Sequence, residues 1–491
     1  MKSGLRVALA LGLGFAVQLP AATYYVNLNN PAPTPPYTNW FIAATNIQDA
    51  VDASSSGDLI LVTNGVYKTG FRGAVDSTPC RVVVDKQVTL RSVNGPDSTI
   101  IEGFSLPGSF PWSLSSVRCA YLTNGASLIG FTLTNGSVRA TAYVNLGDPG
   151  GGVLCASTSE VLSNCVIINC AAYIGGGAQG GTLVNCLITN CLGHIGGGGA
   201  YAANLERCEV IWTTAHNYGG LYLCNATNCN ISYNLGLFGG GAFGGTISHC
   251  TVYGNYAATG GLGGGYGGGV NNVDCQNSII FNNKAYTGGD DVASGTYTNC
   301  CVPVPVGGSG NITNAPMFVD TYDIPGNFHL QPGSPCINAG NNAFATKPID
   351  LDGRPRIVGA KTDMGEYEFQ GGNTNSYLMW LWNYYLLTDI SFDRMDSDGD
   401  SLNNWQEWRA GTAPDNASSV LRMLPGGRDP SGITLSWQSV TNVVYYIQRS
   451  TNMTAAFSSI KSNIVGQAGI TTNLDTTASG LRPFYYRVGV Q

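Results

Sequence analysis

The chain has 491 residues, of which only 11% are charged, and its formal net charge is −7. A strongly basic surface, the usual mark of a nucleic-acid-binding protein, is therefore excluded. Apolar residues make up 43% and aromatic residues 10% of the chain, which excludes a disordered protein. At this length we expect more than one domain, although a solenoid can run long as a single unit.

Residues 1–22 have the pattern of a secretory signal peptide. Lys2 and Arg6 precede an apolar run over 7–19, and Ala21-Ala22 provides small residues for cleavage. The run is shorter than the ~20 residues that span a bilayer, which disfavours a membrane anchor. A later apolar run, 377–387, is also too short, and we interpret it as a packed helix. We predict a secreted or cell-surface protein with no membrane-spanning segment in the mature chain.

A short helix is expected near the start of the mature chain. Thr45 and Gln48 have the spacing of a capping box, and Ile47, Ala50 and Val51 share one helical face. Such a helix would cover the open end of a solenoid, where strand edges otherwise stay unpaired.

Between residues 150 and 302 a glycine run and the pattern Asn-Cys-x-(Ile/Val)-x-x-Asn recur. Asn164-Cys165-Val166-Ile167 and Asn185-Cys186-Leu187-Ile188 are two examples. Successive Cys positions, with Ser278 replacing one, are 21, 22, 21, 21, 28 and 22 residues apart. This period with short strands indicates a solenoid, and the fixed leucines of a leucine-rich repeat are missing. We predict an all-β fold, a right-handed parallel β-helix of about 21–22 residues per coil.

Each repeated Cys and the residue two positions later point the same way along a strand, so both are expected to face the interior. The cysteine column comprises Cys165, Cys186, Cys208, Cys229, Cys250 and Cys300. The preceding Asn suits a bend, because Asn tolerates the left-handed backbone region and its amide can stack on the next coil.

The chain contains 15 cysteines, which in an exported protein usually indicates disulfides. Side chains stacked on adjacent coils do not point at one another, however, and buried Cys packs as a small apolar residue. We therefore favour free thiols over a disulfide ladder. Metal binding by these residues is disfavoured further, because the cysteines do not occur as C-x-x-C pairs.

Several motifs resemble known secreted proteins. The stretches 23–26, 47–51 and 62–67 resemble the opening of secreted right-handed parallel β-helix proteins, and the repeats resemble the polymorphic-outer-membrane type. The stretches 314–320, 328–340, 350–356 and 363–368 resemble a choice-of-anchor Q domain. The resemblance covers 23 to about 370 and implies an architecture, not an activity. We assign 23–312 to the β-helix with its N-terminal cap and 313–372 to a choice-of-anchor Q-like end of the solenoid.

Residues 373–420 are expected to form a linker with a helix and a calcium loop. Oxygen-bearing side chains occupy loop positions one, three, five, nine and twelve: Asp396, Asp398, Asp400, Asn404 and Glu407. Calcium prefers several hard oxygen ligands on a tight loop, so we predict that these five residues bind one ion. An acidic solvated turn is the alternative. The loop resembles thrombospondin type 3 and dockerin-like repeats, but Ser401 stands where an EF-hand loop usually has glycine.

Residues 421–491 alternate apolar and polar positions in short runs separated by turn residues. This pattern predicts a small antiparallel β-sandwich. The segment resembles the fibronectin type III-like modules of exported bacterial proteins.

Catalytic candidates are few and dispersed in the regular coils. Asp290-Asp291 resembles the Asp-Asp element of polygalacturonases, but without that family's other elements a turn-capping pair is preferred. A surface ion pair explains Glu206 and Arg207, which share a unit and lie two coils from His249. Charged residues of the less regular coils could still form a groove. They are Asp76, Arg81, Asp85, Arg91, Glu102, Arg118, Arg139 and Asp148.

Aromatic residues cluster in the middle coils: Tyr201, Trp212, Tyr218, Tyr222, Tyr233, Phe238, Phe243, Tyr253 and Tyr256. Exposed aromatic rings and amides hold sugars, and we take Trp212, Tyr218, Tyr222, Tyr233 and Tyr253 as candidate glycan-binding residues. Alternatively, these rings stack inside the coil or cover its turns. We expect a non-catalytic protein that binds a polysaccharide, a cell-surface glycan or another surface protein. The alternatives are a polysaccharide lyase or glycosidase acting on an acidic polysaccharide, and a structural spacer.

Overall fold

The computed structural model describes residues 21–73, 76, 78–105, 114–139, 148–260, 263–322, 326–331, 333–370, 384, 395–452, 457–478 and 483–490. Most of the expected signal peptide, and all of the apolar run 377–387 except Tyr384, lie outside these residues. The chain forms two compact units, Met1–Phe369 and Gln370–Gln491. None of the helices in the described residues combines the length and the apolar character needed to traverse a lipid bilayer.

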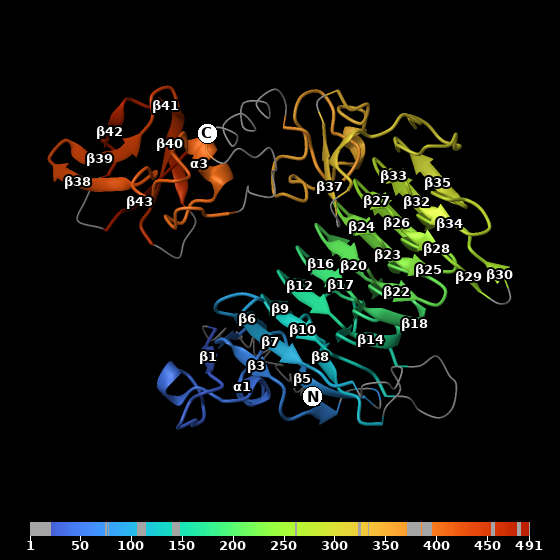
Figure 1. The fold of residues 1–491 in the computed structure, drawn as a ribbon. Coiled ribbons are helices and arrows are strands. Elements are labelled where there is room, and N and C mark those ends of the chain that lie inside the picture. The colour runs from blue at the N-terminus through green and yellow to red at the C-terminus, as the bar shows by residue number, and fades with distance from the viewer. Residues whose placement is uncertain are drawn as a thin grey trace, which may run out of the picture. The chain divides into compact units, whose positions relative to one another are not determined.

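The first unit is a right-handed parallel β-helix, which confirms the fold predicted from the repeat (Figure 1). In the described residues the coils contribute to three long sheets, almost entirely parallel. The first sheet contains β1 (Thr23–Val26), β2 (Leu59–Val62), β4 (Arg72–Gly73), β5 (Pro79–Val84), β6 (Thr89–Ser92), β8 (Arg118–Leu122), β9 (Ser127–Ile129), β11 (Val153–Cys155), β12 (Val161–Ser163), β15 (Ala178–Gln179), β16 (Thr182–Val184), β19 (Ala200–Tyr201), β20 (Asn204–Glu206), β23 (Leu221–Thr227), β26 (Ala242–Ser248), β31 (Val270–Asn271), β32 (Val273–Gln276) and β35 (Gly295–Thr298).

The second sheet contains β3 (Gly65–Tyr67), β7 (Thr99–Glu102), β10 (Thr132–Thr134), β13 (Val166–Ile168), β17 (Leu187–Thr189), β21 (Glu209–Ile211), β24 (Asn230–Ser232), β27 (Thr251–Tyr253) and β33 (Ile279–Phe281). The third sheet contains β14 (Ala171–Ile174), β18 (Leu192–Gly196), β22 (Thr214–Ala215), β25 (Leu235–Gly236), β28 (Tyr256–Ala257) and β34 (Lys284–Ala285). One regular coil therefore runs through the first sheet, the second and the third before the next glycine run returns it to the first.

The bend between the first and second sheets has the left-handed backbone expected of the Asn before each Cys. Its φ values lie between 45° and 54° at Asn164, Asn185, Arg207, Asn228, His249, Asn277 and Asn299. The amides stack as predicted, since Asn185 Nδ2 donates to Asn164 Oδ1 at 2.5 Å. Arg207 and His249 replace Asn at two positions of this column.

The interior is built from columns of identical or similar side chains. The predicted cysteine column is confirmed: Cys165, Cys186, Cys208, Cys229 and Cys250 are each at most 3% exposed and lie in register. Beside it run two apolar columns. They contain Ile167, Ile188, Val210, Ile231 and Val252, and Leu162, Leu183, Leu205, Ala226 and Ile247. All fifteen cysteines are buried free thiols.

A second internal ladder, which the sequence pattern did not reveal, consists of amides. Asn255 Oδ1 accepts hydrogen bonds from the backbone and side-chain nitrogens of Asn234, both at 2.9 Å. Asn283 Oδ1 accepts the same pair from Asn255, and Asp291 Oδ1 ends the ladder with the same pair from Asn283. Each buried amide is thus satisfied by the next coil.

The helix α1 (Ile47–Ala53) lies close to its expected position, and Ile47, Ala50 and Val51 join the solenoid core. The predicted capping box is wrong, because the N-cap is Asn46, whose side chain accepts from Gln48 N. The Gln48 side chain is engaged instead by β5, accepting from Val83 N at 2.8 Å and donating to Val83 O at 3.1 Å. The Gln48 side chain therefore contacts the distant strand β5 instead of the backbone at the start of the helix. A 3-10 helix, η1 (Trp40–Ile42), precedes α1.

The longest step of the repeat, 28 residues, contains an inserted hairpin. Its strands β29 (Thr259–Gly260) and β30 (Gly263–Gly264) pair antiparallel. The first-sheet register continues across the insertion, with Ala242 opposite Val270 and Phe243 opposite Asn271.

Residues 313–369, here called the covering segment, lie against the outer face of the second sheet instead of adding a regular coil. The segment contains β36 (Phe318–Asp320), β37 (Asn327–Leu330) and the 3-10 helix η2 (Asn342–Phe344). Its apolar side chains form a buried cluster with second-sheet residues. The members are Tyr253, Ile279, Cys301, Phe318, Phe328, Leu330, Cys336 and Met364.

The second unit contains α3 (Asn404–Ala410) and two antiparallel sheets of three described strands each. One sheet has β38 (Met423–Asp429), β39 (Gly432–Ser439) and β42 (Gly469–Asp475), and the other has β40 (Val444–Ser450), β41 (Ser458–Val465) and β43 (Tyr485–Val490). Leu435, Trp437, Tyr445, Ile447 and Ile464 from both sheets form one core, as expected of a sandwich.

Candidate functional site

Four aromatic side chains form a strip on the outside of the first sheet. Ala200, Leu221 and Ala242 point inward, so strand alternation turns the next residues, Tyr201, Tyr222 and Phe243, outward. The ring centroids of Tyr201 and Tyr222 lie 5.1 Å apart. Tyr218, from the preceding bend, lies 4.3 Å from the Tyr222 ring and 4.2 Å from the Phe243 ring. These four residues are called the aromatic strip.

A glycine makes room for Tyr218. Gly196 pairs with Tyr218 across neighbouring coils, and a Cβ at Gly196 would lie only 2.6 Å from Tyr218 Cδ2. The ring can therefore lie flat against the bend. The same bend column continues through Phe238 and Tyr266, which extend the aromatic surface, and Tyr266 is 44% exposed.

The side chains of the aromatic strip carry no charge. Its neighbours in the strand column are Gln179, opposite Tyr201, and Asn271, opposite Phe243. Burial, together with the nearby Tyr218 and Tyr201, raises the pKa of the Tyr222 phenol, which keeps its proton at neutral pH. The surface thus offers apolar ring area, phenol hydroxyls and terminal amides.

The structure divides the five predicted glycan-binding residues among three places. It brings Tyr218 and Tyr222 together in the strip. Trp212 is 43% exposed but lies at the bend between the second and third sheets. The prediction is wrong for Tyr253 as a surface residue, because Phe318 and Phe328 of the covering segment leave it 8% exposed. Tyr233 is half-buried against Tyr253, with ring centroids 6.3 Å apart.

The site prediction omitted Tyr201 and Phe243. The signal that could have found them is their position: each follows a glycine run and a small or apolar residue, as Tyr222 does. Aligning the coils on the glycine run or on the Cys places these three rings in one column, because each ring precedes the Cys of its coil by the same number of residues.

Asp290 and Asp291 make hydrogen bonds to nearby backbone and side-chain groups, which agrees with the preferred interpretation of this pair as turn-capping residues. Asp290 accepts from Ala285 N at 2.9 Å and pairs with Lys284 at 3.1 Å. Asp291, 8% exposed, terminates the amide ladder, and burial raises its pKa. With its Oδ1 held by Asn283, this pair does not have the geometry of an acid and a base flanking a substrate.

His249 is not available as a general base. It is 1% exposed, and its Nε2 lies 2.9 Å from Asn277 Nδ2 and 3.2 Å from Thr362 Oγ1. Burial, with a contribution from the charge of Arg356, lowers its pKa to about 2. Two coils away Glu206 pairs with Lys347 at 2.5 Å and approaches Arg207 at 3.9 Å. These groups hold the covering segment in place and do not form an acid–base site.

In the less regular coils Arg118 is fully buried. Its guanidinium lies 2.6 Å from Asp76 Oδ2 and donates to the carbonyls of Gly150 and Pro149 at 2.7 and 2.8 Å. All of these partners hold neighbouring turns together. Arg118 therefore has a structural role.

In the second unit three carboxylates of the predicted calcium loop converge. Oxygen atoms of Asp396, Asp398 and Asp400 lie within 4.8 Å of one another. The loop is held by its own backbone: Asp396 accepts from Gly399 N and Ser401 N, and Asp398 accepts from Asp400 N. Ser401 has φ +79°, so it adopts the left-handed conformation of the glycine it replaces.

Glu407, the fourth carboxylate of the predicted site, lies in the first turn of α3. It is fully buried, and both its carboxylate oxygens are without a hydrogen-bond partner, as are Asp398 Oδ2 and Asp400 Oδ2. Burial and the charges of Asp398, Asp400 and Asp396 raise the pKa of Glu407 to about 8. Asn404 is buried and its Oδ1 accepts from Ser397 Oγ at 3.0 Å. The donor set is that of a hard cation.

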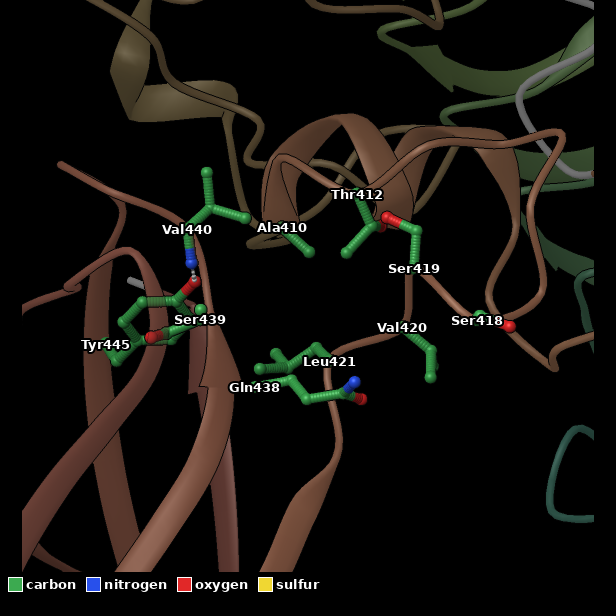
Figure 2. Close-up of a pocket in the computed structure, with 11 residues that line it drawn as sticks. Ala410, Thr412, Ser418, Ser419, Val420, Leu421, Gln438, Ser439, Val440 and Tyr445 are labelled. Atoms are coloured by element: carbon green, nitrogen blue, oxygen red, sulfur yellow. Dashed lines mark hydrogen bonds between the residues drawn. The ribbon is translucent and has the colours of Figure 1, made fainter.

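Figure 2 shows a cavity of about 160 Å³ between the segment after α3 and strands β39 and β40. Thr412, Ser419 and Gln438 are among its lining residues, and Tyr445 Oη accepts from Val440 N at 3.0 Å. None of the described lining residues is a carboxylate, histidine or cysteine. The cavity has no acid–base pair, and we assign it no catalytic role.

No protein-family model matches the chain, and no curated protein matches it in sequence. Among solved structures, it is similar to pectate lyase Pel9A, with TM-score 0.42, 15% identity, and coverage of 72% of this chain and 97% of that chain. It is also similar to Escherichia coli ybhc, with TM-score 0.30, 13% identity, and coverage of 60% and 78%. A rice weevil pectin methyl esterase has TM-score 0.29, 11% identity, and coverage of 54% and 87%. Similarity this low says nothing of activity.

Proposed function

We propose that this chain is an exported, non-catalytic β-helix protein that binds an uncharged polysaccharide through the aromatic strip. The observation that carries the proposal is the outward column of Tyr201, Tyr222 and Phe243, joined by Tyr218. Flat rings contact the apolar faces of sugars, and phenol and amide groups bond to their hydroxyls.

The electrostatics favour a neutral ligand. An acidic polysaccharide needs cations in its groove, whereas the strip and the residues at its ends, Gln179 and Asn271, are uncharged. The chain as a whole carries a net charge of −7, which repels a polyanion further. Because the strip runs along successive coils, an extended chain lying parallel to the solenoid axis contacts several rings at once.

The test measures binding of the purified full chain to neutral and acidic polysaccharides by affinity electrophoresis and calorimetry. We expect retardation by at least one neutral polysaccharide, and a roughly tenfold or greater loss of affinity in Tyr222→Ala. Tyr322→Ala is the matched control, because Tyr322 is 94% exposed on the covering segment, outside the strip. Unchanged binding in Tyr222→Ala, with its fold intact, contradicts the proposal.

The same incubations separate binding from cleavage. Release of unsaturated or reducing ends in the presence of calcium would identify a polysaccharide lyase or a glycosidase. Binding that persists without any such release supports the binding protein. Absence of binding to every polysaccharide leaves the structural-spacer alternative.

We also propose that Asp396, Asp398, Asp400, Asn404 and Glu407 bind one calcium ion. What supports this is the fully buried Glu407 carboxylate facing three converging aspartates, which calcium would neutralise. Asn404 contributes either as a ligand or through its hydrogen bond with Ser397. The ion would have a structural role, since the loop leads directly into the capping box of α3 at Asn403.

Calorimetry and thermal unfolding of the full chain test this site. Calcium should raise the unfolding temperature of the second unit in the wild type but not in Asp398→Asn. Asp415→Asn, outside the loop, is the control and should respond like the wild type. A wild-type chain that shows no calcium-dependent stabilisation at millimolar ion contradicts the proposal.

A further inference from the structure

Two histidines lie opposite each other on the outer face of the third sheet. Strands β18 and β22 are neighbours in this sheet and pair in register, with Gly193 opposite Ala215 (Figure 1). His194 and His216 are the next residues of the two coils. Because Gly193 and Ala215 are buried, strand alternation turns both imidazoles outward.

The two imidazole rings are close together. Their centroids are 6.4 Å apart, and their planes differ by 20°. The ring of Tyr173, on the preceding coil, lies 5.1 Å from the His194 ring. His194 is half-buried, whereas His216 is exposed. Tyr173 therefore supports the His194 ring, and His216 is the member of the pair whose side chain can turn readily.

Histidine is rare in this chain, with four among 491 residues. The other two, His249 and His329, are engaged by the covering segment: His249 Nε2 lies 3.2 Å from Thr362 Oγ1, and His329 Nε2 lies 2.8 Å from Asp352 Oδ2. Half of the imidazoles of the chain are thus gathered at one place on the surface. Imidazole is the commonest metal ligand among side chains.

The surroundings of the pair favour a transition-metal ion over a hard cation. Tyr173 precedes and Leu237 follows the pair on this face, and neither provides the carboxylate oxygens that calcium and magnesium prefer. Imidazole nitrogen suits zinc, nickel and copper, and copper(II) binds most tightly in this series. Burial, together with the charge of a protonated His216, lowers the pKa of His194, which favours the neutral ring that ligates a metal.

We propose that His194 and His216 together bind one divalent late transition-metal ion, copper(II) most tightly, with water in its remaining positions. Metal–nitrogen bonds of about 2.0–2.1 Å, the zinc value, hold two imidazoles in neighbouring positions of one ion closer than the 6.4 Å seen here. Binding therefore requires the exposed His216 side chain to turn toward His194. The site uses no residue of the aromatic strip or the acidic loop, so it depends on neither glycan nor calcium binding.

The experiment titrates the full-length chain, without an affinity tag, with copper(II) or nickel(II) chloride in excess calcium. Pulsed electron paramagnetic resonance of the bound copper(II) counts the coordinated imidazoles. We expect one ion with two imidazoles in the wild type and only one imidazole in His216→Gln. Calorimetry with nickel(II) should show a roughly tenfold or greater loss of affinity in His194→Gln and in His216→Gln, because each variant loses the chelate.

Two further variants separate a chelating pair from single histidines. The exchange of His216→Asn with Asn217→His keeps the number of imidazoles but moves one out of register, and it should bind as weakly as His216→Gln. Tyr256→Phe, 41% exposed on the same sheet, is the control and should bind like the wild type.

Because His216 is exposed, its variants should keep the unfolding temperature of the wild type, which is measured alongside. A single coordinated imidazole in the wild type would overturn the site, since two rings are required. So would an affinity for nickel(II) that His216→Gln or the exchange variant leaves unchanged.

Discussion

Two buried regions of the first unit satisfy their polar groups in different ways. The interior of the regular coils contains thiols, aliphatic side chains and a ladder of amides, and each coil repeats the contacts of its neighbour. The interface beneath the covering segment contains ionisable side chains, and their contacts do not repeat from coil to coil. Arg356, Asp350, Asp363, Glu366 and Glu368 are each at most 3% exposed.

The difference shows where the unit is vulnerable. In a solenoid, stability is approximately a sum of similar nearest-neighbour terms, so removing one of them costs little of the total. In the interface, each buried charge depends on one particular partner, and the loss of that partner leaves a charge uncompensated. Substitutions in the two regions should therefore differ sharply in cost.

The largest effect is expected for Arg356→Met. Removing the guanidinium leaves Glu368 buried without its cation, and we expect a loss of about 3–5 kcal/mol in the free energy of unfolding of the first unit. Urea titration of the full chain measures it. Lys347→Met is the control: it removes the more exposed pair with Glu206 and should cost less than about 1 kcal/mol. Similar losses in both variants would refute the contrast.

Asn255→Ala should have the next largest effect. The variant removes the Asn255 oxygen that accepts from Asn234 N and Nδ2, and the Asn255 Nδ2 that donates to Ile231 O. Asn283 Oδ1 loses one of its two bonds and keeps the one from the backbone N of residue 255. We expect a loss of about 3 kcal/mol in the same titration. Asn225→Ala, which removes the exposed amide bond to Asn204, should change stability by no more than about 0.5 kcal/mol. A cost for Asn255→Ala as small as that of Asn225→Ala would show that the ladder does not stabilise the coil.

His249→Asn tests the interface through its pH dependence. The pKa of His249 is lowered to about 2 in the folded chain, from its ordinary value of about 6.5. Below about pH 6.5 the unfolded chain therefore binds a proton that the folded chain does not, so acid removes stability. Between pH 6.5 and pH 5 the free energy of unfolding of the wild type should therefore fall by about 2 kcal/mol through His249 alone. His249→Asn should not show this loss. Urea titrations at several pH values measure both slopes, and parallel slopes would contradict the assignment.

The smallest effect is expected for Cys208→Ala in the cysteine column. The change removes one fully buried sulfur atom, whose single weak S–H donor lies 3.4 Å from both Leu183 O and Glu206 O. We expect a loss of about 1 kcal/mol, the cost of one small apolar group. If the loss matched that of Asn255→Ala, the thiols would have to be regarded as a polar ladder too.

The regular coils could be predicted because their interactions are periodic. Cys165 and Cys186, with the Asn before each, recur at the interval of one coil, so the spacing carries both the strand register and the left-handed bend. The amide ladder was missed because Thr213 and Cys191 replace Asn in its earlier coils. The proposed calcium loop is local, and its converging aspartates follow from spacing within one turn.

The covering segment could not be derived in this way. Its contacts join residues far apart in the chain, such as Asn228 with Ile349 and Asn277 with Asn341, and none of them repeats. Tyr253 was therefore taken as a surface residue although Phe318 and Phe328 cover it. Glu366 lies in the motif 363–368, but nothing in that motif predicted that its side chain is fully buried.

The hairpin β29–β30 has a consequence for how such a chain can change in length. It adds residues at one corner of a coil, yet the strands before and after it keep their pairing, with Ala242 opposite Val270. That corner follows the third sheet, next to the bend column of Phe238 and Tyr266. Insertions there alter the surface beside the aromatic strip without disturbing the stack within. If the strip binds a glycan as proposed, lengthening this corner can add contacts to the ligand while the interior of the coil keeps its packing.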